Sequence, residues 1–429
     1  MVIKPGLDRV KRLLECFGEP QKSFKTVHVT GTNGKGSTCS YIAYALAHAG
    51  YRVGLFTSPY ISKINEYMSL ILPEEDGAVR TLQISDEELG RLFETAEVFA
   101  EDMEDKPSEF ETAFAAACEF FKDHGCEIVV VEVGMGGRDD ATNVIDPPLT
   151  AVFTNIGIDH VRYLGTTIEE ITRNKAGIIK QGSDVVCYMM CSQAKDDTDE
   201  ASTAGDTQGN RAIEILRGVA KDKGCGFRVA KESVREYEGM EDADILMPGL
   251  FQEKNAAVSL ETVYLLASKG YNVNKKDLAW ALANVALPAR FEILSENPLV
   301  IADGGHNPQC IGALTESLSS RGLEGAVIFV TAFMADKDVE QSLGLIKPFA
   351  REMFCTAPDS ERAMSPEELC RLAGGLGIKA RACESVREGV REALSLLREE
   401  TNKCAVCICG SFYMMDEARA AAKETLKKS

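Results

Sequence analysis

The stretch that decides the fold is HVTGTNGKGST, residues 28–38. It joins an apolar run at 26–30, which predicts a strand, to an alanine-rich run at 37–49, which predicts a helix. A strand, a glycine-rich turn and a helix N-terminus form a phosphate cradle, because small residues let backbone N–H groups approach the oxygens and the helix dipole favours an anion. The stretch therefore predicts a phosphate-binding loop in an α/β domain.

Two side chains of this loop suit a nucleotide site. Lys35 can reach the terminal phosphates, and the Ser37 hydroxyl can ligate Mg²⁺. The common phosphate-loop pattern places Ser or Thr directly after Lys, whereas Gly36 intervenes here, so the loop is a variant. The alternative is a glycine-rich surface turn with an incidental Lys, which the flanking strand and helix disfavour.

The composition excludes several classes of protein. The chain has 429 residues, 45% of them hydrophobic, and a formal net charge of −19. Such acidity disfavours nucleic acid and anionic membranes as partners, because binding to them depends on Lys and Arg. The apolar runs fall short of the about 18 residues that a membrane span needs, and the N-terminal segment is too charged for a signal peptide. We expect a cytoplasmic monomer.

Apolar β-rich runs alternate with helical patterns along most of the chain, which is typical of parallel sheets with crossover helices. Capping boxes at Ser85 and Ser108 predict the starts of two helices. Residues 191–210 are polar and lack a hydrophobic period, so we expect a surface loop there. The other predicted elements of the first half are strands at 52–56, 127–133, 150–155 and 184–189 and a helix at 168–176.

A boundary is predicted where the helical region 252–286 ends in LPAR, since Pro288 breaks the helix. Residues 1–287 would form a P-loop ATPase-like parallel-sheet domain and 288–429 a smaller Rossmann-like α/β domain. Cys404, Cys407 and Cys409 could be metal ligands, but the alternation of Cys407 and Cys409 in an apolar run followed by Gly410 favours a buried strand. The strands predicted for the second domain are 299–303, 326–331, 352–356 and 403–409.

Two further motifs carry polar residues at predicted strand ends. Glu132 opens EVGMGGRDDATN and could complete a Mg²⁺ shell with Ser37. His160 closes TNIGIDH and is a candidate metal ligand. Arg138 could hold an anionic group, although an Arg in a loop is more often solvated.

A series of motifs occurs in a fixed order: GTNGKGS, FTSPY, FETAF, EVGMGGRDDATN, TNIGIDH, NKAGI, RFE, DGGHNP and CGSFY. They closely resemble the folylpolyglutamate synthase and dihydrofolate synthase family, a branch of the Mur ligase superfamily, from about residue 5 to residue 420. The resemblance implies that ATP phosphorylates the carboxylate of a folate or dihydropteroate. The amine of L-glutamate would then attack this acyl phosphate, and phosphate would leave.

The resemblance also implies roles for individual residues. Ser37 and Glu132 would hold one Mg²⁺, and His160 and Lys175, the Lys of NKAGI, would belong to a second metal site. Arg290 would reach the ATP phosphates. The phosphates would also bind the loop residues Thr32, Asn33, Gly34, Lys35, Gly36 and Ser37, and further ATP contacts from across a cleft between the domains would come from Asn255, Arg290, Asp303 and His306.

The Lys175 ammonium cannot ligate Mg²⁺, and the family carries this Lys as its carbamate, whose oxygens can. The alternative is a plain Lys175 that binds the substrate phosphate or a neighbouring carboxylate. Glu111 is also ambiguous, because it fits both the FE motif of the family and the capping box begun by Ser108. The chain departs from the family pattern at Asn174, Phe251, Ala289 and Tyr60.

Two other functions compete with this one. A ligase acting on UDP-linked muramyl peptides usually has an additional N-terminal domain, for which the about 30 residues before the loop leave no room. A nucleotide-dependent switch would need neither the second metal site nor a second ATP-contacting domain. The sequence leaves open whether the first glutamate, later glutamates or both are added.

Overall fold

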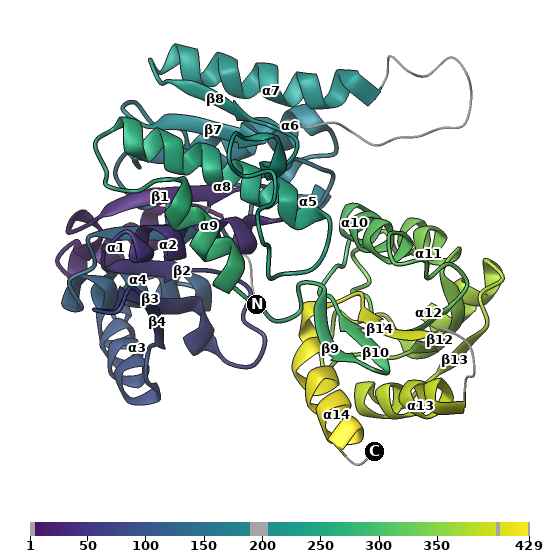
Figure 1. Ribbon diagram of the computed structural model, residues 1–429. Coiled ribbons are helices and arrows are strands. Elements are labelled where there is room, and N and C mark those ends of the chain that lie inside the picture. Colours follow the sequence, from purple (N-terminus) through teal and green to yellow (C-terminus); the bar gives the residue numbers. More distant parts are fainter. Residues whose placement is uncertain (1–4, 189–204, 400–403, 428–429) are drawn as a thin grey trace. The chain divides into compact units, whose positions relative to one another are not determined.

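The computed structural model describes residues 5–188, 205–399 and 404–427 (Figure 1). Contacts between Cα atoms divide the chain into two compact units. The first consists of Met1–Ile245 and Glu253–Val285, and the second of Leu246–Gln252 and Ala286–Ser429. The second unit thus includes a short segment, Leu246–Gln252, that the sequence did not assign to it.

The first unit is built on an eight-stranded sheet in the order β4-β3-β2-β5-β1-β6-β7-β8. Strand β3 pairs antiparallel with both β2 and β4, and all other neighbours in this sheet are parallel. Because β1 lies between β5 and β6, the segments that follow these three strands emerge side by side. The strands are β1 Lys25–Thr30, β2 Val53–Phe56, β3 Met68–Pro73, β4 Val79–Gln83, β5 Ile128–Glu132, β6 Thr150–Phe153, β7 Asp184–Tyr188 and β8 Phe227–Ala230.

The helices of this unit begin where local chemistry caps them. The Ser85 hydroxyl accepts the amide of Glu88 at the start of α3, and Ser108 and Glu111 form a reciprocal box at the start of α4. The helices are α1 Asp8–Cys16, α2 Lys35–His48, α3 Asp86–Ala100, α4 Glu109–Asp123, α5 Val161–Leu164, α6 Ile168–Lys175, α7 Gly205–Asp222, α8 Phe251–Ser268 and α9 Lys275–Asn284.

The loop predicted at 191–210 is wrong over residues 205–210, which form the start of α7. The first six residues of α7, GDTQGN, are polar or glycine, so this stretch of sequence carries no hydrophobic period. Residues 191–204 lie outside the described residues.

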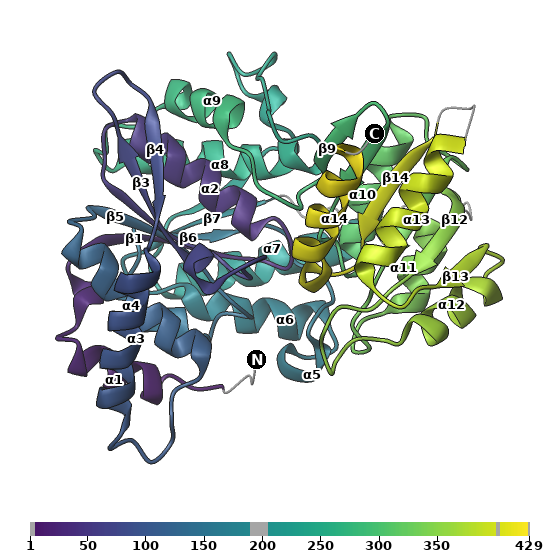
Figure 2. The ribbon, with the colours of Figure 1, turned by 90° about the horizontal axis from the view of Figure 1, so that it is seen from below.

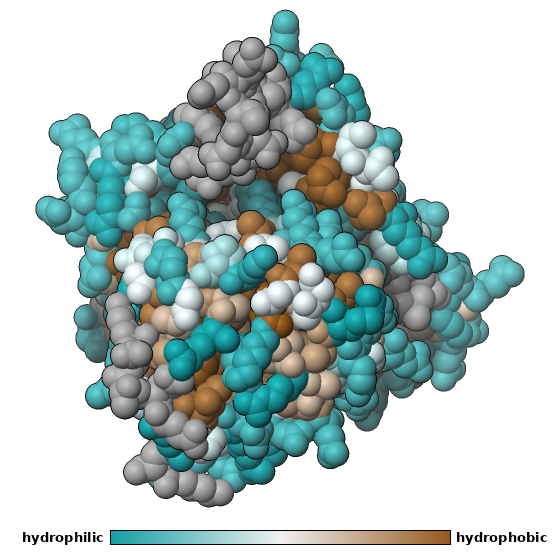
Figure 3. Space-filling model, turned by 90° about the vertical axis from the view of Figure 1, so that its right-hand side faces the viewer, coloured by the Kyte–Doolittle hydropathy of each residue, from teal (hydrophilic) through white to brown (hydrophobic). Residues whose placement is uncertain are grey.

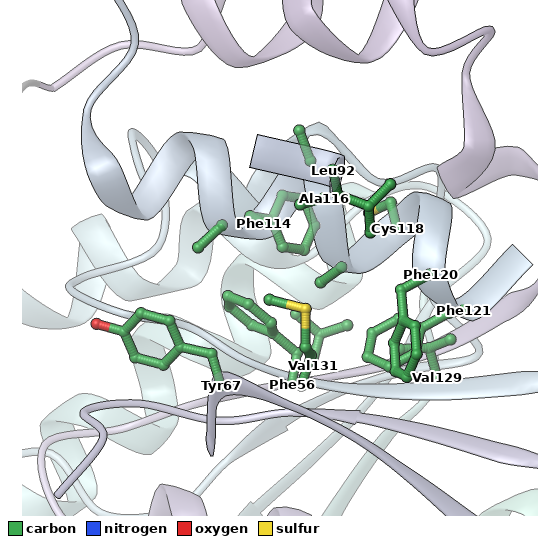
Figure 4. Packing of buried hydrophobic residues seen from close by; sticks show 14 of the residues in the cluster. Phe56, Tyr67, Leu92, Phe114, Ala116, Cys118, Phe120, Phe121, Val129 and Val131 are labelled. Carbon is green, nitrogen blue, oxygen red and sulfur yellow. The ribbon is translucent and has the colours of Figure 1, made fainter. Parts of the chain in front are cut away.

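The α4 helix packs on the sheet through aromatic side chains. Phe114, Phe120 and Phe121 are each at most 2% exposed and face Phe56 and Val129 (Figure 4). A Cβ at Gly54 of β2 would lie 2.7 Å from the ring of Phe121, so this position needs glycine. This contact holds α4 tightly against β2. The loop after β1 therefore leaves a closely packed sheet.

The second unit contains a six-stranded sheet in the order β13-β12-β11-β14-β10-β9, parallel except for the edge strand β9. Helices α10 and α11 cover one face, and α13 covers the other (Figure 1). The strands are β9 Glu292–Glu296, β10 Leu299–Ala302, β11 Val327–Thr331, β12 Ala350–Cys355, β13 Ala380–Ala382 and β14 Ala405–Cys409. The helices are α10 Pro308–Ser319, α11 Val339–Ile346, α12 Pro366–Gly375, α13 Val386–Glu399 and α14 Met415–Lys427, and Figure 2 shows them from below.

Two cysteines of CAVCICG belong to a buried strand, as predicted, whereas the half-buried Cys404 precedes that strand. Cys407 and Cys409 are fully buried in β14. Across the ranges that the structure describes, no three His, Cys, Asp or Glu residues are placed to hold a metal ion.

The molecular surface mixes polar and apolar residues. On the face in Figure 3, brown hydrophobic patches are interrupted by teal hydrophilic side chains. None of the helices in the described ranges has the length and apolarity to cross a membrane.

Candidate active site

The phosphate loop leaves the carboxyl end of β1 and is tied to the segment that follows β6. Thr32 donates its amide to the carbonyl of Asn155, 2.7 Å away, and the Asn33 amide donates to Asn155 Oδ1, also at 2.7 Å. The Thr154 hydroxyl donates to the Asn33 carbonyl at 2.7 Å. The loop is therefore preorganised by the neighbouring strand end.

Two glycines are required by close approaches. Gly31 has φ +156°, and a Cβ there would lie 1.8 Å from the Thr154 hydroxyl oxygen. Gly34 caps α2 with φ +83°, and its Cβ would lie 2.3 Å from Oδ1 of Asn255 on α8. Asn255 is thus in the same unit as the loop. The expectation that it acts from across a cleft is wrong, because α8 packs beside the loop.

Two residues predicted for the site, Lys35 and Glu132, lie at this edge of the sheet. Lys35 Nζ donates to the Thr32 carbonyl at 3.2 Å and lies 3.9 Å from Glu132 Oε1. The Glu132 side chain is 3% exposed, and its Oε2 accepts the amide of Ser58 at 3.0 Å. Ser37 is buried in the first turn of α2. The Lys35 ammonium and the Ser37 hydroxyl thus follow β1, and the Glu132 carboxylate ends the adjacent strand β5.

Lys175 brings the end of α6 to the same place. Its Nζ donates to the Gly31 carbonyl at 2.7 Å, and the residue is 3% exposed. Burial and then the charge of Lys35 lower the pKa of Lys175 from 10.5 to about 7. A small hollow is lined by Gly31, Thr32, Lys35, Gly134, Met135, Gly136, Asp159, His160, Leu164 and Lys175.

His160 lines this hollow in a left-handed conformation, with φ 51°, at the start of α5. The carboxylate of Asp159 accepts the His160 amide at 2.7 Å, and the Asp159 side chain is 8% exposed. The sequence did not identify Asp159 or Asn155 as site residues. The sequence signal that could have identified them is their place in the TNIGIDH motif, where Asn155 follows Thr154 and Asp159 precedes His160.

These residues fit a hard cation only in part. Glu132 and Ser37 supply oxygen donors of the kind that Mg²⁺ prefers, and His160 supplies a nitrogen. Lys175 as an ammonium supplies no ligand, but a low pKa makes its neutral amine accessible near neutral pH.

In the second unit, Arg290 lies in an unusual turn. Ala289 and Phe291, its neighbours, have φ of 55° and 52°. The Phe291 amide donates to Asp303 Oδ2 at 2.8 Å, and the Gly305 amide donates to Oδ1 at 2.7 Å. Asp303 is 6% exposed and burial raises its pKa. Its carboxylate therefore joins the RFE and DGGHNP motifs.

His306 and Phe412 complete this part of the second unit. His306 Nδ1 is 3.0 Å from the Gly304 carbonyl oxygen. The Arg290 guanidinium carbon lies 4.2 Å from the centre of the Phe412 ring. Sequence reasoning named Arg290, Asp303 and His306 but not Phe412, although its motif CGSFY was recognised.

The ambiguous Glu111 and two positions that depart from the family pattern, Tyr60 and Asn174, have structural roles. Glu111 accepts bonds from the Ser108 amide at 2.7 Å and from Arg9 Nε at 3.0 Å, so it secures the start of α4. Tyr60 packs edge-on against Tyr67 with ring centres 5.1 Å apart. Asn174 packs against Gly136, whose Cβ would lie 2.4 Å from Asn174 Oδ1.

Comparisons with known proteins place the chain in a class. Residues 29–263 match the Mur ligase middle domain, and residues 289–412 match the Mur ligase glutamate ligase domain. Together these matches span more than half of the chain. The fold and site thus define an ATP-dependent ligase of the Mur ligase type.

The relatives narrow this class. The chain is 34% identical to the dihydrofolate synthase/folylpolyglutamate synthase of Bacillus subtilis over 86% of this chain and 84% of that protein. It is 30% identical to the folylpolyglutamate synthase of Lacticaseibacillus casei over 96% of this chain and 93% of that one. The chain belongs to the folylpolyglutamate and dihydrofolate synthase family.

Solved structures agree with this assignment. Mycobacterium tuberculosis folylpolyglutamate synthase complexed with ADP has a TM-score of 0.82 and 27% identity, covering 98% of this chain and 95% of that one. Escherichia coli FolC in complex with DHPP and ADP has a TM-score of 0.80 and 26% identity, covering 100% and 95%. A Yersinia pestis bifunctional synthase complexed with AMPPNP and Mn ion has a TM-score of 0.77 and 27% identity, covering 98% and 94%.

Proposed function

We propose that the protein uses ATP to join L-glutamate to the carboxylate of a folate or dihydropteroate through an acyl phosphate. The observation that carries this proposal is the meeting of Lys35, Glu132, His160 and Lys175 beside the phosphate loop. Phosphoryl transfer depends mainly on positioning and charge stabilisation, so a cluster of this kind suits it without a protein nucleophile.

The loop would hold the ATP phosphates through its backbone amides and Lys35. The residues proposed for this are Thr32, Asn33, Gly34, Lys35, Gly36 and Ser37. Lys35 carries a positive charge at the start of α2, where the helix dipole adds to it. This field would stabilise negative charge as the γ-phosphoryl group moves to the substrate carboxylate.

Ser37 and Glu132 would hold Mg²⁺, with His160 and Lys175 at a second metal position. When bound, these ions would neutralise charge on the phosphates. The amide of Ser58 donates to Glu132 Oε2, so it would fix the orientation of this carboxylate toward the metal position.

Lys175 would contribute as a carbamate. Its neutral amine attacks CO₂, so that an N–C bond forms, one C=O π bond breaks and one proton leaves the nitrogen, and the two oxygens of the product share a single negative charge. The pKa of about 7 supports this step, because a large fraction of the amine is neutral at neutral pH. The alternative is an unmodified Lys175 that binds phosphate.

The second unit would contribute Arg290, Asp303 and His306 to ATP, and Asn255 would contribute from beside the phosphate loop. Arg290 has the charge for a phosphate. Asp303 already accepts two backbone amides, so any contact to a ribose hydroxyl would use its remaining lone pairs. We also propose residues 1–287 and 288–429 as the functional domains.

The experiment that tests the proposed function is ADP release by the full chain with Mg²⁺ and ATP. Dihydropteroate plus glutamate tests the first addition, and tetrahydrofolate plus glutamate tests later ones. UDP-linked muramyl substrates form the third arm, and a nucleotide-dependent switch would release ADP without forming any glutamyl product.

A further inference from the structure

Phe412 stands at a junction of the second unit. It follows β14, whose end is bonded to the segment after β10: the Asp303 amide donates to the Ile408 carbonyl at 2.9 Å, and the Gly410 amide donates to the Gly305 carbonyl at 2.9 Å. Phe412 is 9% exposed. These hydrogen bonds thus fix the chain just before Phe412 to the DGGHNP segment.

The ring of Phe412 lies beside three residues: Arg290 and His306, which are proposed to bind ATP, and Gly304. The Arg290 guanidinium carbon is 4.2 Å from the ring centre, within the range of a cation–π interaction. The His306 ring lies 5.9 Å away, edge-on at 64°. A Cβ at Gly304 would lie 2.3 Å from a ring carbon, so only glycine lets the ring sit there.

The backbone of Arg290 is held separately. The Phe291 amide bonds to Asp303 on one side, and the Ala289 amide donates to Glu292 Oε2 at 2.9 Å on the other. Glu292 in turn receives two bonds from the Arg419 guanidinium, at 2.8 and 3.0 Å. The turn is therefore rigid, and only the side chain of Arg290 remains to be oriented.

That side chain has no ion-pair partner within the described ranges, so the charge of its guanidinium is available to an anion. A long side chain loses rotamer freedom when it binds, and this cost falls if a contact holds it beforehand. Phe412 is the aromatic surface on which the guanidinium rests.

We propose that Phe412 is a positioning residue that holds the Arg290 guanidinium ready for the phosphates of a nucleotide. This inference rests on the proposed function only in so far as Arg290 binds ATP. It adds a residue that contacts no reacting atom and acts through another side chain.

The test is a double-mutant cycle on ATP affinity, measured by calorimetry with the full chain, Mg²⁺ and a non-hydrolysable ATP analogue. Phe412→Leu should weaken binding about 3- to 10-fold, and Phe412→Tyr, which keeps the ring face, should restore most of it. In an Arg290→Ala background, Phe412→Leu should have almost no further effect, because the group it positions is gone.

A matched control is Phe354→Leu. Phe354 is 1% exposed and also carries an Arg over its ring, with the Arg381 guanidinium carbon 5.1 Å from the centre. It lies on β12, two strands from β14 in the sheet order. Phe354→Leu should lower the thermal unfolding temperature as Phe412→Leu does but leave analogue affinity unchanged.

Additive effects of the two substitutions, or unchanged affinity in either single variant, would overturn the inference. Equal loss of affinity in Phe354→Leu would do so as well, since general destabilisation would then explain the result. If the protein bound the analogue but formed no glutamyl product, the proposed function would be wrong. The double-mutant cycle on analogue affinity would still test the role of Phe412.

Discussion

The ammonium of Lys175 donates a hydrogen bond to the carbonyl oxygen of Gly31, 2.7 Å away. Gly31 is the first residue after β1, and Lys175 is the last residue of α6. The contact joins the start of the phosphate loop to the proposed second metal position. A change in the charge of Lys175 therefore acts directly on the loop.

The low pKa of Lys175 predicts a pH-dependent stability. The unfolded chain keeps the ordinary value near 10.5, whereas the folded chain has about 7, so the unfolded state binds more protons between these values. Wild type should therefore gain stability relative to Lys175→Met as the pH rises from 7 to 9.5. The gain should be on the order of 3 kcal/mol, at about 1.4 kcal/mol per tenfold change.

Urea unfolding in CO₂-free buffer, without nucleotide, measures this difference. Trp280, the single tryptophan of the chain, lies in α9 of the first unit and reports on that unit by fluorescence. Parallel pH profiles for the two proteins would mean that Lys175 keeps an ordinary pKa.

Replacing Lys175 by Ala should reduce turnover at least about 100-fold, because an aimed electrostatic group is lost. Acetate or formate should restore part of the activity by supplying the missing carboxylate oxygens. Lys180→Ala is the matched control, since burial also lowers the pKa of Lys180, to about 8, while its ammonium donates to the carbonyls of Asn143 and Ile145. Rescue of both variants, or of neither, would argue against a Lys175 carbamate.

Lys35→Ala should slow turnover by roughly 10²-fold or more, on the order of 3 kcal/mol, if its charge stabilises the transferring phosphoryl group. Lys63→Ala is a suitable comparison, because the Lys63 side chain is 57% exposed and pairs with Asp86. Steady-state ADP release measures both variants. Near-normal turnover in Lys35→Ala would be incompatible with the phosphate-loop assignment.

Glu132→Gln should raise the Mg²⁺ concentration needed for half-maximal activity by about tenfold or more, since it removes the charge of a proposed metal ligand. The amide can still accept the bond from Ser58, so thermal unfolding should change little. A Mg²⁺ titration of ADP release gives the answer, and an unchanged midpoint would remove Glu132 from the metal site.

Local patterns predicted the parts of the fold that depend on neighbouring residues. The strand before the loop, the helix after it and the capped start of α4 all follow from short stretches of sequence. The strand β4 was not predicted, because four of its five residues are exposed and no apolar face marks it. The edge strand β9 was not predicted either. Its first four residues are only half-buried, so no apolar face marks it.

Site residues were predictable where a motif carried their chemistry, as for Lys35 and Glu132. The position of Asn255 beside Gly34 depends on how α8 packs, and no local pattern contains that information. The same applies to Phe412, whose importance comes from Arg290, a residue more than 100 positions away in the chain. Tertiary packing, rather than local propensity, determines such pairs.

The most direct test of the assigned ligase activity is ADP release by the purified full chain with Mg²⁺ and ATP, measured together with the glutamylated product. We predict that ADP forms in step with product only when L-glutamate and either dihydropteroate or a reduced folate are both present. ADP release that is independent of these substrates, or equal turnover with UDP-linked muramyl substrates, would contradict the account.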